Sequence, residues 1–165
     1  MYYKKQVMDV YLRLSKYFLL IIICLIIFGS CTQIDLHEKN VTVPNNKWQS
    51  DFVAKSTFTI TDSVCKYKVY VVLRHTDAYE YNNIWLNVGL QQMGEATNYL
   101  KLNLNLSNDK NGWSGVGMND IWEVREIIAN QTLKKGTYST SIQQLMRQNP
   151  LLHIISVGIR VEKVV

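Results

Sequence analysis

The sequence is poor in cysteine. Only three cysteines occur in 165 residues, at positions 24, 31 and 65. Small exported domains without a large core are typically stapled by several disulfides. Cys24 lies inside an apolar run and Cys31 follows that run after two intervening residues, which leaves Cys65 without a partner, so no disulfide framework is expected. Cys65 begins an apolar strand pattern, where a buried and inert thiol is favoured over a reactive one.

Runs of lysine and arginine are missing, and so are the common catalytic motifs. Without a basic run the sequence lacks the phosphate-tracking surface of nucleic-acid-binding proteins, and no nucleic-acid partner is expected. Residues 112–116 begin like a nucleophile elbow but end in valine, and residues 115–120 lack the third glycine of a dinucleotide loop. The three histidines, His37, His75 and His153, stand far apart in the sequence, so neither a metal nor another cofactor is predicted.

Acidic residues offer one remaining route to catalysis. Glycoside hydrolysis requires a pair of carboxylates, for which the candidates are Asp77, Glu80, Asp120 and Glu123. Four scattered acids are more simply interpreted as solvated loop charges. The sequence therefore does not predict an enzyme.

The most informative stretch is the apolar run of residues 17–28, YFLLIIICLIIF. It follows a segment with four basic residues and is itself followed by Gly29 and Ser30, immediately before Cys31. This order is typical of a secretory signal peptide, and the run is short for a spanning helix, which needs about 20 apolar residues. The arrangement resembles a bacterial lipobox, in which the signal is cut before the cysteine and the cysteine is acylated. An uncleaved anchor and an ordinary cleaved signal are the alternatives.

The predicted cut divides the chain into three parts. Residues 1–30 are the signal peptide, with cleavage between Ser30 and Cys31. Residues 31–47 are polar and without periodicity, which predicts a flexible tether, and residues 48–165 form the folded domain. Most of the formal net charge of +5 leaves with the leader, so the basic balance says nothing about nucleic acid. The mature protein is expected to be held at a membrane through lipidated Cys31.

Beyond the tether, apolar residues recur at every second position. The clearest case is residues 100–106, LKLNLNL, which predicts a strand with four buried leucines. Similar alternation covers residues 52–60, 67–74, 84–91, 138–146 and 154–161. Residues 121–128 fit a strand or a short helix, with the strand favoured, and residues 107–119 are predicted to be a loop. Seven or eight short strands separated by turns predict an all-β fold, an antiparallel β-sandwich of jelly-roll type.

Residues 75–85, HTDAYEYNNIW, place aromatic rings among amides and acids. Flat rings among such groups are able to stack on sugars while the polar groups bind sugar hydroxyls. The candidate binding loop consists of Asp77, Tyr79, Tyr81, Trp85 and Trp113. Three interpretations stand: a glycan site, a protein contact, or tyrosines that only cover the open end of the sheet.

Several segments occur in an order that resembles the GldH-type gliding-motility lipoproteins of Bacteroidetes. They are the leader with Cys31, PNNKW (44–48), LRHTDAYEYNNIWL (73–86), GWSGVGMNDI (112–121), KGTYSTSIQQLMR (135–147) and VGIRVEK (157–163). The resemblance covers nearly the whole mature chain, and PNNKW and IQQLMR are its most telling segments. It implies an outer-membrane lipoprotein, facing the periplasm, that the gliding machinery and the allied type IX secretion system need. It also implies envelope proteins as partners and assigns no catalytic residue. The alternative is a surface lipoprotein with a carbohydrate-binding sandwich.

The resemblance also implies a modification site. Bacteroidetes O-glycosylate exported proteins at Asp-(Ser/Thr)-(small apolar) triplets, and residues 62–64, DSV, are the only match in this chain. The triplet falls where the strand pattern breaks, so Ser63 is predicted to lie in an exposed turn. The alternative is a turn in which Asp62 and Ser63 only bond their own backbone.

Overall fold

The computed structural model describes residues 36–108 and 112–164, and nearly all of them belong to strands or to short connections. The long strands are β1 (Leu36–Thr42), β3 (Ala54–Ile60), β4 (Lys66–Thr76), β5 (Asn83–Gln92), β6 (Asn98–Asn105), β10 (Ile121–Thr132), β11 (Gly136–Gln144) and β13 (Ile154–Val164). The short elements are the 3-10 turn η1 (Pro44–Asn46) and the strands β2 (Lys47–Trp48), β7 (Ser107–Asn108), β8 (Gly112–Trp113), β9 (Val116–Met118) and β12 (Leu151–Leu152).

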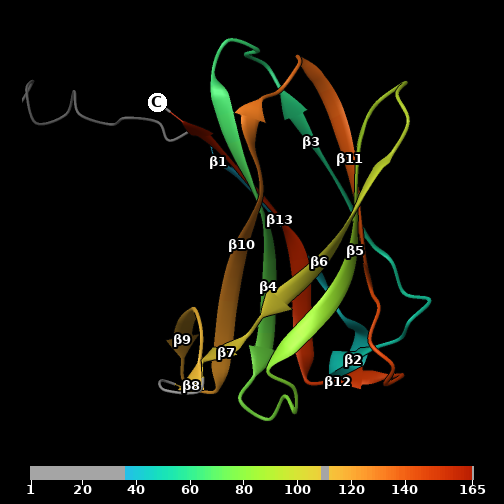
Figure 1. Cartoon of the computed structure of the whole chain (residues 1–165), viewed down its shortest axis with the longest axis vertical. Coiled ribbons are helices and arrows are strands. Elements are labelled where there is room, and N and C mark those ends of the chain that lie inside the picture. The colour runs from blue at the N-terminus through green and yellow to red at the C-terminus, as the bar shows by residue number, and fades with distance from the viewer. Residues whose placement is uncertain (1–35, 109–111, 165) are drawn as a thin grey trace, which may run out of the picture. The chain divides into compact units, whose positions relative to one another are not determined.

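The long strands form two packed antiparallel sheets (Figure 1), while β12 with β2 and β7 with β8 form two small two-stranded sheets. One sheet has the order β1-β13-β4-β10-β9 and the other the order β3-β11-β5-β6. The long strands pair as nested hairpins: β1 with β13, β3 with β11, β4 with β10, and β5 with β6. This nesting folds one long antiparallel ribbon into two sheets, which is the jelly-roll arrangement. The predicted all-β sandwich is confirmed.

The core lies between the sheets and is filled by the alternating side chains. Along β3 and β11 every second residue is buried, as the sequence pattern predicts. Residues 121–128 are a strand, as favoured, while the predicted loop of residues 107–119 contains β7, β8 and β9. The four-leucine prediction is wrong for Leu100, which is 42% exposed, whereas Leu104 and Leu106 are buried. The reason is that β6 is an edge strand and its first half belongs to a hairpin that stands away from the facing sheet (Figure 1).

The predicted tether is wrong from residue 36 onward. Strand β1 pairs with β13 along its whole length, from Leu36 opposite Glu162 to Thr42 opposite Ser156. Val43 is already buried, so the domain begins before Trp48. The segment looks polar because alternate residues of β1 face outward and bond other strands. Residues 31–35 and the predicted cleavage and lipidation site at Ser30 and Cys31 lie outside the described residues.

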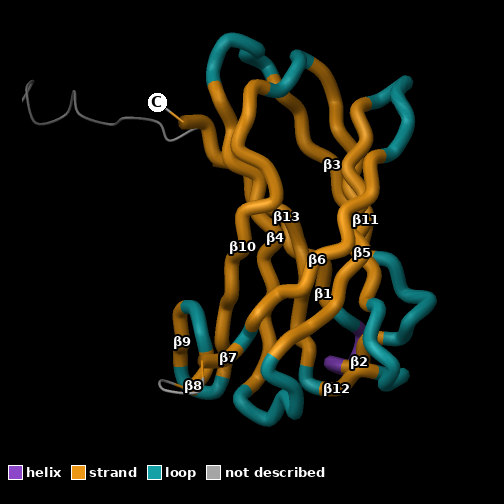
Figure 2. The backbone as a smooth tube through the Cα atoms, viewed as in Figure 1, coloured by secondary structure: helices purple, strands orange, loops and turns teal. Residues whose placement is uncertain are grey.

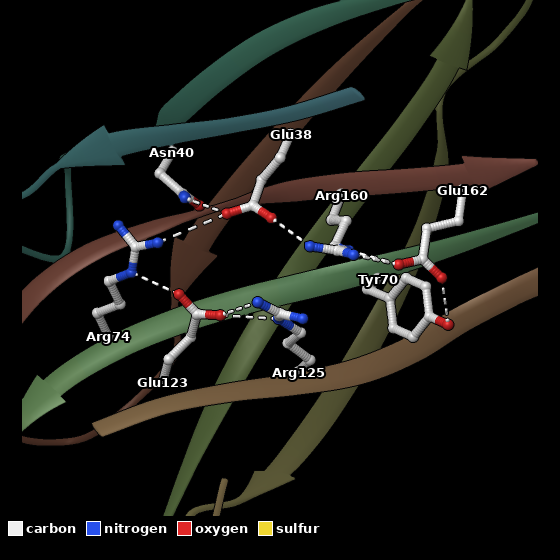
Figure 3. A network of polar contacts seen from close by, with 8 residues as sticks. All are labelled: Glu38, Asn40, Tyr70, Arg74, Glu123, Arg125, Arg160 and Glu162. Carbon is white, nitrogen blue, oxygen red and sulfur yellow. Dashed lines mark hydrogen bonds and ion pairs between the residues drawn. The ribbon is translucent and has the colours of Figure 1, made fainter. Parts of the chain in front are cut away.

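The outer face of the five-stranded sheet carries a network of charged side chains (Figure 3). Arg160 Nη1 donates to Glu38 Oε2 at 3.0 Å, and Arg74 Nε donates to Glu123 Oε2 at 2.6 Å. Val72 lies on the same face and is fully buried. The network thus covers apolar surface and pairs charges from four strands. These charged side chains therefore stabilise the sheet and are engaged with one another.

Two carboxylates of the network have shifted pKa values. Burial alone would raise the pKa of Glu123, but hydrogen bonds from Arg74 and Arg125 outweigh it and hold the pKa below its ordinary value. Glu162 behaves in the same way: burial opposes the shift, and hydrogen bonds from Arg160 and Tyr70 lower the pKa. Both groups therefore stay ionised at neutral pH and are engaged within the protein.

Loops gather at two opposite ends of the sandwich (Figure 2). The first end carries Trp48, Trp113 and Trp122, with Trp85 near the start of β5 beside it, and consists of residues 43–53, 77–82, 106–108, 112–122 and 145–153; we call it the tryptophan end. The second consists of residues 61–66, 93–97 and 133–135, and we call it the lysine end. Strand β1 begins at the lysine end, because Leu36 is paired with Glu162 near the end of β13.

Candidate functional site: a hollow at the tryptophan end

The tryptophan end is organised around Trp48, whose side chain is fully buried. Its Nε1 donates to Phe52 O at 2.9 Å, and the residue pairs with Leu151 between β2 and β12. Asn45 and Asn46 precede it with φ values of 53° and 55°, a left-handed conformation that asparagine tolerates better than most residues. The PNN turn therefore redirects the chain so that Trp48 enters the core.

Residues 145–148 cross this end beside β5. Leu145 N donates to Trp85 O at 2.8 Å, and Trp85 N donates to Met146 Sδ at 3.4 Å. The buried Gln144 fixes the path of the segment, because its Oε1 accepts from Met146 N at 2.7 Å and its Nε2 donates to Trp48 O at 3.5 Å. The two most telling sequence segments, PNNKW and IQQLMR, are thus joined through one side chain.

A hollow of about 450 Å³ lies here, lined by Tyr81, Asn83, Trp85, Leu145, Met146, Arg147 and Gln148. Trp85 and Leu145 are 44% and 42% exposed. Arg147 is exposed and forms no ion pair with a described residue. An exposed ring and an exposed aliphatic chain beside an unpaired cation are typical of a recognition surface.

The structure separates the predicted binding residues. Tyr81 and Trp85 line the hollow, but Tyr79 is only 3% exposed and its hydroxyl donates to Asn83 O at 3.2 Å. Burial raises the pKa of the Tyr79 hydroxyl. Tyr79 therefore belongs to the core, and its prediction as part of an exposed binding loop is corrected.

Trp113 and Asp77 lie on the other flank of this end. The Trp113 ring contacts His75 edge-on, with centroids 4.7 Å apart, and Asp77 N donates to Asp120 O at 2.8 Å. His75 is fully buried, with Nδ1 2.8 Å from Thr76 O, and burial lowers the pKa of its imidazole. These contacts hold residues 112–120 against the aromatic loop and away from the hollow.

Sequence reasoning missed one wall of the hollow, residues 145–148. Their composition is unremarkable, and they become a wall only because β11 ends at Gln144 and the chain then runs beside Trp85. One signal was available: Leu145 breaks the alternation of residues 138–146, which indicates that the strand ends there.

At the lysine end, Ser63 is exposed in the turn between β3 and β4, as predicted. Asp62 accepts from Val64 N at 2.9 Å and from Lys163 Nζ at 2.9 Å. These bonds, led by the one from Lys163, lower the pKa of Asp62 to about 2. Cys65 is half-buried, and its hydrogen bond to Asp62 raises the pKa of the thiol, which suits the predicted inert role.

A second hollow, of about 470 Å³, is lined largely by the outer face of the four-stranded sheet. Its lining includes hydroxyls of Thr57, Ser139 and Ser141, the ring of Tyr99, and Lys39 and Lys55, without a carboxylate. Gly89 forms its floor, where a Cβ atom would collide with Ser141 Oγ. The hollow is therefore polar and cationic.

Within residues 36–108 and 112–164, no group of three or more histidine, cysteine or acidic side chains is arranged to hold a metal ion. The same residues include no helix with the length and hydrophobicity needed to cross a membrane.

Comparison with known proteins identifies the family of this chain from its sequence. The sequence model of the GldH lipoprotein family matches residues 35–161. The chain is 26% identical over 159 residues to the gliding motility lipoprotein GldH of Flavobacterium johnsoniae, covering 92% of this chain and 99% of the relative. It is 26% identical over 154 residues to a gliding motility lipoprotein GldH homolog of Christiangramia forsetii, covering 86% of this chain and 92% of the relative. Among solved structures, the Cry4Aa toxin of Bacillus thuringiensis aligns with a TM-score of 0.43 at 11% identity, over 78% of this chain and 21% of the toxin. Because the family match spans nearly all of the described residues, this chain belongs to the GldH family of gliding-motility lipoproteins.

Proposed function

We propose that this protein is an outer-membrane lipoprotein, anchored through acylated Cys31 and facing the periplasm, that braces or assembles the gliding-motility and type IX secretion machinery. Family membership supports a role in gliding motility. The observation that carries the proposal is the hollow at the tryptophan end, where exposed Trp85 and Leu145 meet an unpaired Arg147.

The composition of the hollow favours a protein partner. Tryptophan, methionine and arginine are enriched where proteins bind each other, and tryptophan and arginine dominate the binding energy. The walls are fixed in advance by the bond from Leu145 N to Trp85 O and by the buried Gln144. A rigid site loses less conformational entropy on binding. The partner we expect is an envelope protein of the machinery that offers an apolar side chain to Trp85 and a carboxylate to Arg147.

Catalysis forms no part of the proposal. Of the four acids considered from the sequence, Glu123 is bonded to Arg74 and Arg125. Its oxygens are therefore occupied by cations and are not free for general acid or base chemistry.

The function is tested by deleting the gene in the native host and restoring it with variants. We expect the deletion to reduce secretion of type IX cargo into the medium, and colony spreading if the host glides. The double variant Trp85→Ala/Leu145→Ala should restore little of either, while Val116→Ala/Met118→Ala, an exposed apolar pair at the same end that lines neither hollow, should restore both. Normal secretion and spreading in the deletion strain would refute the proposed role.

The anchor is tested separately. In Cys31→Ala the precursor should remain uncut before residue 31 and should take up no fatty-acid probe, because the acylated sulfur is gone. Equal labelling of the variant and the parent would exclude lipidation at Cys31.

The second candidate function, a surface lipoprotein that binds glycans, is favoured by the polar hollow on the four-stranded sheet. Its hydroxyls, its exposed Tyr99 and its lysines suit a sugar carrying acidic groups. Pull-down from crosslinked envelopes distinguishes the two. Stable neighbours from the motility or secretion machinery support the first function, and co-purifying polysaccharide without such proteins supports the second.

A further inference from the structure

Two loops at the lysine end carry apolar side chains at their most exposed points. Val64, between β3 and β4, is 88% exposed, and Met93, between β5 and β6, is 78% exposed. Neither belongs to the hydrophobic core or packs against it. Single exposed apolar side chains are common on protein surfaces, and Val116 and Met118 at the tryptophan end are exposed as well. Val64 and Met93 become informative through the charge beside them and the point at which the chain enters the fold.

The charge at the lysine end is positive. Its two carboxylates are already paired, Asp62 with Lys163 at 2.9 Å and Glu95 with Lys134 at 2.9 Å. Lys66 and Lys135 are exposed and form no ion pair with a described residue. The end therefore offers exposed apolar side chains together with uncompensated cations.

The chain also enters the fold at this end. Leu36, the first residue of β1, is paired with Glu162, and Val164 at the end of β13 is paired with Lys66. Cys31 precedes Leu36 by five residues, which extend over at most about 17 Å. A lipid on Cys31 would therefore keep this end within that distance of the bilayer.

We propose that the lysine end is a second membrane contact, in addition to the lipid. Val64 and Met93 enter the boundary between headgroups and acyl chains, and Lys66 and Lys135 bind the phosphates of anionic lipids. The hollow at the tryptophan end then faces away from the membrane. The inference rests on the proposed acylation of Cys31, and it adds which part of the fold touches the bilayer.

The test uses the acylated full protein, purified from its host and reconstituted into vesicles of phosphatidylcholine with phosphatidylglycerol and a brominated lipid. In a Cys65→Ala background, an environment-sensitive fluorophore is attached to Met93→Cys or to Gln148→Cys at the opposite end. Acylation blocks the sulfur of Cys31. We expect bromine to quench the fluorophore at 93 and to leave the one at 148 nearly unquenched. The double variant Lys66→Gln/Lys135→Gln should weaken quenching at 93, whereas Lys47→Gln/Lys101→Gln, with the same charge loss elsewhere, should not.

The possible failures are distinguishable. Protein that does not float with the vesicles refutes the acylated anchor and, with it, this inference. Protein that floats but shows equal quenching at both positions, or stronger quenching at 148, overturns the membrane contact and leaves the anchor intact. Quenching at 93 that is insensitive to the lysine substitutions removes the lysines from the contact.

Discussion

The two ends of the sandwich are closed by the same sheets but are built in different ways. At the tryptophan end three large side chains turn inward and are buried: Trp48 of β2, His75 near the end of β4, and Tyr79 in the loop that follows β4. The loops of the lysine end, residues 61–66, 93–97 and 133–135, contain no aromatic side chain that could close the core in this way, and Val64 and Met93 stand out into solvent. Val116 and Met118 are also exposed at the tryptophan end, but they lie on β9, away from the buried cluster and the hollow. An end that extends the core has a fixed shape, which suits recognition of one partner. An end with projecting apolar side chains and free lysines suits a fluid surface, which adapts to them without requiring a fixed shape.

The largest effect expected from this difference is on stability. Trp48→Ala should lower the free energy of unfolding by about 3–5 kcal/mol, because it empties a core site. Val64→Ser should change it by no more than about 0.5 kcal/mol, because the side chain is 88% exposed. Urea unfolding followed by circular dichroism measures both. Similar losses for the two variants would contradict the described difference between the ends.

A smaller effect is expected within the aromatic loop. Tyr79→Phe removes the hydroxyl that donates to Asn83 O, which should cost about 1 kcal/mol of unfolding free energy. Tyr99→Phe is the matched control, because Tyr99 is 66% exposed, and it should be neutral. If Tyr79→Phe were also neutral, the hydroxyl would not contribute to closing this end.

The ends should also respond differently to pH. Burial lowers the pKa of His75 below its ordinary value of 6.5, so on acidification the unfolded chain takes up a proton before the folded protein does. The free energy of unfolding should therefore fall as the pH drops below 6.5 towards the folded pKa. His75→Phe should flatten that slope in unfolding curves recorded between pH 8 and 5.5.

Asp62 at the lysine end supplies the control for this measurement. Its pKa is lowered to about 2, so its contribution is present above the unfolded value of 3.8 and is lost only as the pH falls towards 2. Asp62→Asn should leave the slope between pH 8 and 5.5 unchanged. If His75→Phe kept the parental slope, His75 would not be its source.

The turn of residues 62–64 carries two competing predictions. The triplet predicts a sugar on Ser63, whereas contact of Val64 with lipid predicts an unmodified turn, because a glycan would hold the loop away from the bilayer. Intact-mass measurement of protein from the native host, beside Ser63→Ala, decides between them. We expect the native mass to equal that of the acylated chain. A sugar that disappears in Ser63→Ala would establish the modification and exclude Val64 from the membrane contact.

The sequence was sufficient to predict the sandwich because alternation is a local property of each strand. The sequence-based prediction failed at β1, which the residue pattern predicts to be part of a tether. Glu38 of β1 is held by Arg160, 122 positions away, and no local pattern reveals that contact. The prediction failed for Tyr79 because alternating tyrosines in a loop do not reveal which one turns inward. The wall formed by Leu145 and Met146 depends on Trp85, 61 positions from Met146, and no local pattern contains that contact.

The opposite orientation of the two ends is tested most directly by placing a photo-crosslinking amino acid at position 85 or at position 93 in the native host. The expected result is that position 85 forms adducts with a protein of the motility or secretion machinery and position 93 forms adducts with lipid. Protein adducts at position 93, together with lipid adducts at position 85, would contradict the proposed orientation.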